Sequence, residues 1–237
     1  MISDDKRAPM LVHLEELRWR VVKAAASLVL GAILAYVFRD QLFAWISRPY
    51  YEAFPDSELV TIRPAESFSA AMRLALFGGF VLASVPITWQ AWAFVSPGLT
   101  KKERKWVVPV VLTSVSLFLL GVAFAYYILP RGLTFLQETL DVGQETAVSE
   151  YLNFALRFLL VFGISFEFPI VLFMAGALGL VKSQQLARGR RWAVLVIAVV
   201  GAAATPTGDP FTMLFLSIPL YLLYEITLLA IRYILRK

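Results

Sequence analysis

Cysteine is absent from this 237-residue chain, and histidine occurs once, as His13. The missing cysteines exclude a disulfide framework and a thiolate metal site. One histidine leaves almost no material for a zinc centre or a Ser-His-Asp relay. No glycine-rich phosphate-binding loop occurs in the sequence either. We therefore expect no metal, no cofactor and no enzymatic activity.

Charged residues are also scarce, at 16%, whereas hydrophobic residues make up 59% of the chain. A soluble domain of this size is far less apolar, so the composition predicts an integral membrane protein with several spans. Backbone polar groups must be satisfied within the membrane, and we expect an all-α fold. The first 20 residues are charged and lack an apolar core, which predicts that no cleavable signal peptide is present.

Six apolar runs predict six transmembrane helices in a single membrane domain. They lie approximately at residues 21–38, 72–94, 107–129, 154–180, 192–205 and 211–231. The last two helices are expected to be short. In the fifth run only about 13 residues, or ~20 Å of helix, precede Thr205-Pro206, and the sixth run is interrupted by Pro219 and Glu225.

Other segments complete this outline. Residues 10–20 have leucines on one side and charges on the other, which predicts an interfacial amphipathic helix. Ser27, Gly31 and Ala35 recur at four-residue spacing in the first run and predict the close approach of a neighbouring helix. Residues 39–70 contain three prolines that should break any long helix, and they are long enough for a folded cap outside the membrane.

The basic residues predict the orientation. Sixteen of the 22 lysines and arginines lie in the segment up to Lys23, the turns at 95–106 and 181–191, and the carboxyl terminus. Only five lie in the segments that alternate with these. By the positive-inside rule, both termini are expected in the cytoplasm, with the chain in the cytoplasmic (inner) membrane. The basic residues thus record membrane orientation, and we expect no nucleic-acid partner.

Glu167 lies near the centre of the fourth run, where an acid costs at least a few kcal/mol and is a functional candidate by default. Pro169, two residues further on, should kink the helix beside the carboxylate. Taken by itself, Glu167 is either an acid satisfied by a neighbouring helix or the ionisable site of a proton-coupled secondary carrier. The sequence alone leaves both interpretations open.

Glu16 and Glu103 are carboxylates among basic residues on the predicted cytoplasmic face. Each could form a solvated ion pair with Arg18, Arg104 or Lys102. Alternatively, the two carboxylates could receive guanidinium groups from a partner, because arginine and carboxylate form bidentate, charge-assisted pairs. Sequence spacing does not choose between these alternatives.

Several motifs occur together along nearly the whole chain. They are His13-Leu14-Glu15-Glu16-Leu17-Arg18, Trp92-Ala93-Phe94-Val95-Ser96-Pro97-Gly98-Leu99 with Glu103-Arg104, Ser165-Phe166-Glu167-Phe168-Pro169, Thr205-Pro206 with Asp209, and Pro219-Leu220-Tyr221 with Glu225. In content and order they resemble the TatC family, the multi-span component of the twin-arginine protein translocase. The resemblance implies a receptor that binds the twin-arginine signal peptides of folded cargo and recruits the single-span partners TatA and TatB.

The resemblance also implies roles for individual residues. Glu16 and Glu103 would meet the consecutive arginines, with Phe94 beside them and Arg18 in the same patch. Of the adjacent acids Glu15 and Glu16, we assign the role to Glu16, because it directly precedes Leu17-Arg18.

Within the membrane, the resemblance makes Glu167 a polar contact for a partner's transmembrane helix. Glu225 is expected to pair with Arg232, and Asp209 to fix the tight outer turn. Pro49 and Phe68 match family positions in the first outer loop, and their residue types predict loop rigidity and a buried aromatic ring.

The short fifth and sixth spans would form the docking edge for TatA- or TatB-type partners, because a mismatched helix locally thins the bilayer. We expect contact with membrane lipid and a homo-oligomer within the complex.

Overall fold

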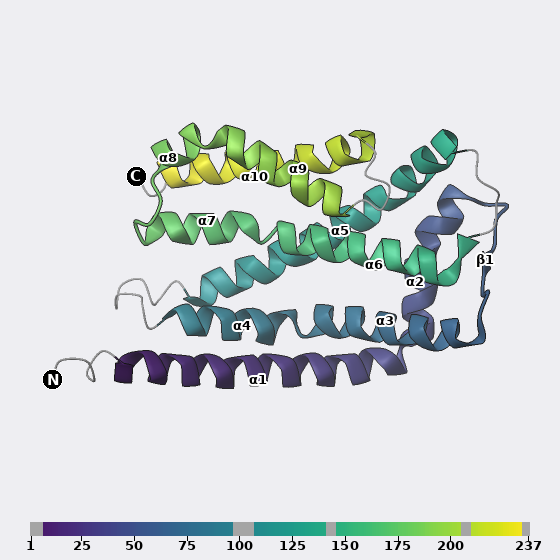
Figure 1. Ribbon diagram of the computed structural model, residues 1–237, viewed down its shortest axis with the longest axis horizontal. Helices are drawn as coiled ribbons and strands as arrows, with labels where there is room; N and C mark the ends of the chain where they lie inside the picture. Colours follow the sequence, from purple (N-terminus) through teal and green to yellow (C-terminus); the bar gives the residue numbers. More distant parts are fainter. Residues whose placement is uncertain (1–6, 97–106, 141–145, 205–209, 234–237) are drawn as a thin grey trace.

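The computed structural model describes residues 7–96, 107–140, 146–204 and 210–233, and these are almost entirely helical (Figure 1). The helices are α1 (Arg7–Val37), α2 (Arg39–Ala53), α3 (Pro64–Leu82), α4 (Ser84–Val95), α5 (Val107–Leu140), α6 (Val148–Ser165), α7 (Phe168–Ala177), α8 (Ser183–Arg188), α9 (Arg190–Ala204) and α10 (Pro210–Tyr233). Two short strands, β1 (Leu59–Val60) and β2 (Thr146–Ala147), pair in parallel. Apart from this pair, the all-α expectation is confirmed.

The helices run mostly along one direction of the molecule. α1 packs against α3 and α4, α5 packs against α6, and α10 packs against α7 and α9. The start of α1 and the end of α10 lie at one end, whereas α2 and β1 lie at the other (Figure 1). The amino- and carboxyl-terminal helices therefore begin and finish at the same end of the fold.

Four segments of the described chain are long and apolar enough to cross a membrane: His13–Val37, Ala65–Leu82, Val107–Thr134 and Val148–Ala177. α9 has 15 residues, or ~22 Å of helix, which is short of a ~30 Å hydrocarbon core. α10 has 24 residues, with Pro219 inside it. The expected shortness is thus confirmed for α9, whereas α10 continues unbroken through Pro219, because membrane helices tolerate an internal proline.

Helix boundaries also differ from the apolar runs. α1 continues without interruption from Arg7, so the expected interfacial helix and the first span form one helix. α3 begins at Pro64, and α4 follows after a break at Ala83. Pro86 lies in the first turn of α4, where its missing N–H is not needed. α5 continues through Pro130 to Leu140, beyond the third predicted span, which was expected to end near residue 129.

α1 and α3 approach closely at small residues. A Cβ atom added to Gly31 would lie 2.7 Å from the carbonyl oxygen of Gly79, and one added to Gly78 would lie 2.9 Å from the Cβ of Ala35. Only glycine permits such an approach of two backbones. The predicted close contact at the four-residue spacing in the first span is therefore confirmed, with α3 as the neighbour.

Pro49 lies inside α2 and is buried, so the expectation of a rigid loop is wrong. A proline provides no N–H for the carbonyl four residues earlier, which here belongs to Trp45. The hydroxyl of Tyr126 donates a hydrogen bond of 2.9 Å to that carbonyl, and its ring stacks on the Trp45 ring. The side chain from α5 thus replaces the missing backbone donor and fixes α2 across the end of the bundle.

Phe68 is 67% exposed, and its expected burial is wrong. The buried residues of α3 include Glu66, Ala70 and Leu74, at four-residue spacing along one face. A residue two positions from Ala70 lies about 200° around the helix, on the opposite side. Phe68 therefore points away from the core.

Glu66 is 7% exposed and connects the starts of two helices. Its carboxylate accepts hydrogen bonds from the backbone N–H groups of Ile62 at 2.9 Å and Arg63 at 3.2 Å, and from that of Ser149 at 2.7 Å. One carboxylate thus caps α3 and holds the first turn of α6 beside it.

Candidate functional site

One cluster of side chains joins the beginning of α1 to the end of α4. The imidazole ring of His13 stacks on the ring of Phe94, with centroids 4.3 Å apart and planes inclined by 16°. Glu16 follows three residues later on the same face of α1, and its Oε2 lies 3.8 Å from Nδ1 of His13. The structure therefore brings together Glu16 and Phe94, two of the expected site residues, through His13.

Glu16 also holds a guanidinium group. Nε and Nη2 of Arg20 both donate to its Oε1, at 3.0 Å and 2.5 Å. The side chains of Arg20 and Glu16 are 24% and 32% exposed, so the pair is partly shielded from water. Glu16 is thereby held with Oε1 toward Arg20 and Oε2 toward His13.

The remaining candidates from the sequence are Arg18, Glu15, Lys102, Glu103 and Arg104. Arg18 is exposed, and its guanidinium carbon lies 5.8 Å from the centroid of the neighbouring Trp19 ring. The neighbouring acid Glu15 is exposed too. Glu103, with Lys102 and Arg104, lies outside the described residues, as does Asp209.

A second site forms where the fourth predicted span is broken. α6 ends at Ser165 and α7 begins at Phe168, with Pro169 in its first turn. Glu167 occupies the position just before α7, so the predicted kink beside the carboxylate is confirmed. The hydroxyl of Ser114 on α5 donates a 2.6 Å hydrogen bond to Oε2 of Glu167.

This hydrogen bond extends to α4, because the indole Nε1–H of Trp92 donates to the hydroxyl oxygen of Ser114 at 3.3 Å. Ser114 is 1% exposed and is a polar residue within the apolar part of α5. Trp92 and Phe94 are two residues apart on the same helix. α4 therefore contacts Glu16's cluster through Phe94 and the Glu167 site through Trp92 and Ser114.

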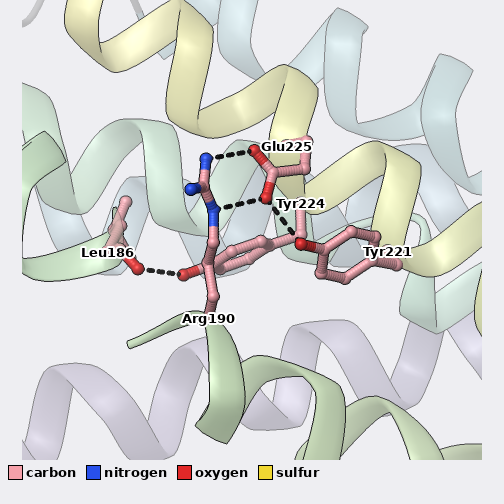
Figure 2. Close-up of polar contacts among 5 residues, drawn as sticks. All are labelled: Leu186, Arg190, Tyr221, Tyr224 and Glu225. Atoms are coloured by element: carbon pink, nitrogen blue, oxygen red, sulfur yellow. Dashed lines mark hydrogen bonds and ion pairs between the residues drawn. The ribbon is translucent and has the colours of Figure 1, made fainter. Parts of the chain in front are cut away.

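The third charged site joins α9 to α10, as Figure 2 shows. Nε and Nη2 of Arg190 donate to the two oxygens of Glu225 at 2.7 Å and 2.9 Å, in a bidentate pair. The hydroxyl of Tyr221 donates to Oε1 of Glu225 at 2.8 Å, and the hydroxyl of Tyr224 donates to the Leu186 carbonyl at 2.7 Å. These contacts attach α8 and the start of α9 to the middle of α10.

The expected partner of Glu225 was Arg232, and this expectation is wrong. Glu225 and Arg232 are seven residues apart on one helix, which separates their Cα atoms by ~10 Å. Arg190 instead reaches Glu225 directly from another helix. The guanidinium carbon of Arg232 instead lies 5.9 Å from the centroid of the Tyr233 ring. Glu225 thus has a structural partner, as expected, from a different element.

The sequence did not single out His13, Arg20 or Ser114 as site residues. His13 and Arg20 lie three residues before and four residues after Glu16, and this helical spacing could have predicted that both contact it. No comparable signal exists for Ser114, because 53 residues separate it from Glu167. In the described part of the chain, no three His, Cys, Asp or Glu side chains lie together as a group that could hold a metal ion.

Comparison with known proteins gives a consistent result. The family described as Sec-independent protein translocase protein (TatC) matches residues 12–219. The TatC protein of Aquifex aeolicus is 35% identical over 225 residues, which cover 93% of each chain. The TatC protein of Deinococcus radiodurans is 38% identical over 226 residues, covering 92% of this chain and 84% of the relative.

Two crystal structures of a twin-arginine translocase receptor TatC resemble the fold over most of its length. One has a TM-score of 0.82 at 34% identity and covers 93% of this chain and 98% of that chain. The other, in the detergent DDM, has a TM-score of 0.84 at 35% identity and covers 92% and 98%.

Proposed function

The chain belongs to the TatC family of Sec-independent protein translocase components, and from this membership we propose that it binds twin-arginine signal peptides and forms the assembly core of the translocase. A TatC protein is a membrane-embedded translocase receptor and not an enzyme.

The observation that carries the proposal is the cluster of Glu16, His13 and Phe94 at one end of the bundle. A guanidinium group pairs with a carboxylate through two parallel hydrogen bonds and stacks on an aromatic ring. The Glu16 carboxylate lies beside the stacked rings of His13 and Phe94, which suits an arginine side chain better than a lysine ammonium. Glu103 and Arg18 complete the proposed patch, with Glu103 as the second carboxylate for the second arginine.

Recruitment of partners is assigned to Glu167. Its carboxylate lies at a helix break in an apolar segment, with Oε2 held by Ser114. A polar side chain in the transmembrane helix of a TatA- or TatB-type partner would meet it there. An interhelical hydrogen bond of this kind is worth only ~1 kcal/mol, which suits reversible assembly.

α4 provides the connection between the two steps. Phe94 on this helix belongs to the peptide-binding cluster, and Trp92 contacts Ser114 and, through it, Glu167. A peptide that moves Phe94 would therefore shift the same helix that supports the partner contact. This makes α4 the element through which cargo binding is coupled to partner recruitment.

We place both termini in the cytoplasm and the protein in the cytoplasmic (inner) membrane. The segregation of basic residues and the shared end of α1 and α10 support this orientation. α9, at 15 residues, remains the proposed docking edge for single-span partners in a complex with several copies of this chain. The proton-coupled carrier considered for Glu167 gains no support from membership of a translocase family.

Site-specific crosslinking tests the proposal. A photoreactive residue at Phe94 is expected to capture a twin-arginine signal peptide, and one at Phe168, exposed beside Glu167, to capture single-span partners. Ile62, exposed beside β1 at the opposite end, is a matched control that should capture no signal peptide. Equal capture of the peptide from Ile62 and Phe94 would reject the assignment of the peptide site.

A further inference from the structure

The carboxylate assigned to the signal peptide already binds an arginine of its own chain. Arg20 donates two hydrogen bonds to Oε1 of Glu16, from Nε and Nη2. We propose that Arg20 is a resident competitor at the receptor site, so that a twin-arginine peptide binds Glu16 by exchange with it. This inference rests on the proposed function, and it adds a residue that sets the affinity of the site.

The geometry favours exchange over simple addition. A bidentate guanidinium pair needs both carboxylate oxygens, and both donors of Arg20 are directed at Oε1 of Glu16. Oε2 has His13 at 3.8 Å, which is too long for a hydrogen bond, so His13 does not use the acceptor capacity of this oxygen. An incoming arginine could therefore meet one oxygen of Glu16 while Arg20 stays, and both oxygens once Arg20 leaves.

The energetics permit this exchange. Arg20 and Glu16 are four residues apart on one helix, and both side chains are partly exposed. Ion pairs of this type are individually weak. A peptide arginine that also stacks on Phe94 gains contacts that Arg20 lacks in its present position. The resident pair therefore lowers the affinity without preventing binding, which favours release of the peptide after delivery.

Exchange of Arg20 for a peptide arginine predicts how the peptide affinity depends on salt concentration. When the peptide replaces Arg20, one ion pair at Glu16 is substituted for another. When Arg20 is absent, the peptide creates a net new pair, and binding should weaken more steeply as salt is added. A residue that only supports the helix would not change this slope.

The test is the affinity of the full-length protein in detergent micelles for a fluorescent twin-arginine peptide, measured over a range of salt concentrations. We expect Arg20→Gln to tighten binding about two- to fivefold at low salt, the range that a weak helix pair implies. The same variant should also steepen the salt dependence. Arg20→Lys keeps the net charge but loses the forked guanidinium group. The peptide affinity of this variant should therefore lie between those of the wild type and Arg20→Gln.

Lys23→Gln is the matched control for charge. Lys23 is exposed on the next turn of α1, and no carboxylate in the described residues lies within ion-pair distance of it. A gain in Arg20→Gln no larger than in Lys23→Gln, or a loss of affinity, would overturn the competitor role. Circular dichroism melting establishes that each variant is folded.

Glu16→Gln separates this inference from the function on which it rests. If Glu16→Gln weakens binding but Arg20→Gln leaves affinity and salt slope unchanged, the exchange is wrong and the receptor function stands. If Glu16→Gln leaves binding unchanged, the proposed peptide site itself is wrong.

Discussion

The ring of His13 on α1 lies stacked on the ring of Phe94 on α4, 4.3 Å between centroids. This contact places an aromatic face beside Glu16, which is one turn further along α1. The only histidine of the chain thus joins the two helices that carry the proposed receptor residues. We expect it to position them.

His13→Ala is expected to weaken binding of a twin-arginine peptide about two- to tenfold, because a stacked aromatic pair contributes roughly 0.5–1.5 kcal/mol. His13→Tyr keeps a stacking ring and should recover most of the affinity. Leu14→Ala, at an exposed neighbouring position, is the control. Peptide titration followed by fluorescence anisotropy measures all three, and equal affinities of the Ala and Tyr variants would argue against positioning through the ring.

Ser114→Ala should reduce partner capture at Glu167. The substitution removes the donor to Glu167 and leaves the indole N–H of Trp92 without its acceptor. Photo-crosslinking to TatA- and TatB-type proteins from position 168, which is exposed and leaves Glu167 intact, measures the effect, with Ser116→Ala, exposed on the same helix as Ser114, as the control. Signal-peptide binding should persist in both variants. Unchanged partner capture in Ser114→Ala would show that this hydrogen bond does not support the partner contact.

The pair of Arg190 and Glu225 is expected to stabilise the packing of α9 against α10. Arg190→Ala should lower the thermal unfolding midpoint more than Arg191→Ala, which removes a neighbouring exposed charge. A double-mutant cycle with Glu225→Gln should show that the two effects are not additive. Additive effects would mean that the pair contributes nothing beyond its separate residues.

Glu66→Gln should lower the thermal midpoint, because an amide oxygen is a weaker acceptor than a carboxylate and the amide nitrogen accepts nothing. Three backbone N–H groups depend on this carboxylate. Glu58→Gln, an exposed acid between α2 and α3, controls for the loss of charge. Identical melting of the two variants would show that the cap does not depend on Glu66.

Some features were predictable from sequence because their causes are local. The small residues around Gly31 predicted a close helix contact, and Pro169 predicted the break beside Glu167. Both follow from a missing side chain or a missing N–H at the residue itself. The neighbour in each case, α3 for Gly31 and Ser114 for Glu167, depends on the tertiary fold and carried no sequence signal.

The errors have the same origin. Pro49 was expected to break a helix, yet α2 continues because Tyr126 supplies a donor from α5. Glu225 was matched with a basic residue on its own helix, whereas Arg190 approaches from the neighbouring one. In both cases a partner distant in sequence satisfies the group, and local spacing cannot reveal such a partner.

The most direct test of the receptor function is the binding of paired peptides to the purified protein. One peptide carries two consecutive arginines and the other carries two lysines at the same positions. We predict that the wild-type protein prefers the arginine peptide and that Glu16→Gln removes most of this preference, because the fork geometry of the pair is lost. Equal binding of both peptides by the wild type, or an unchanged preference in Glu16→Gln, would contradict the proposed receptor site at Glu16.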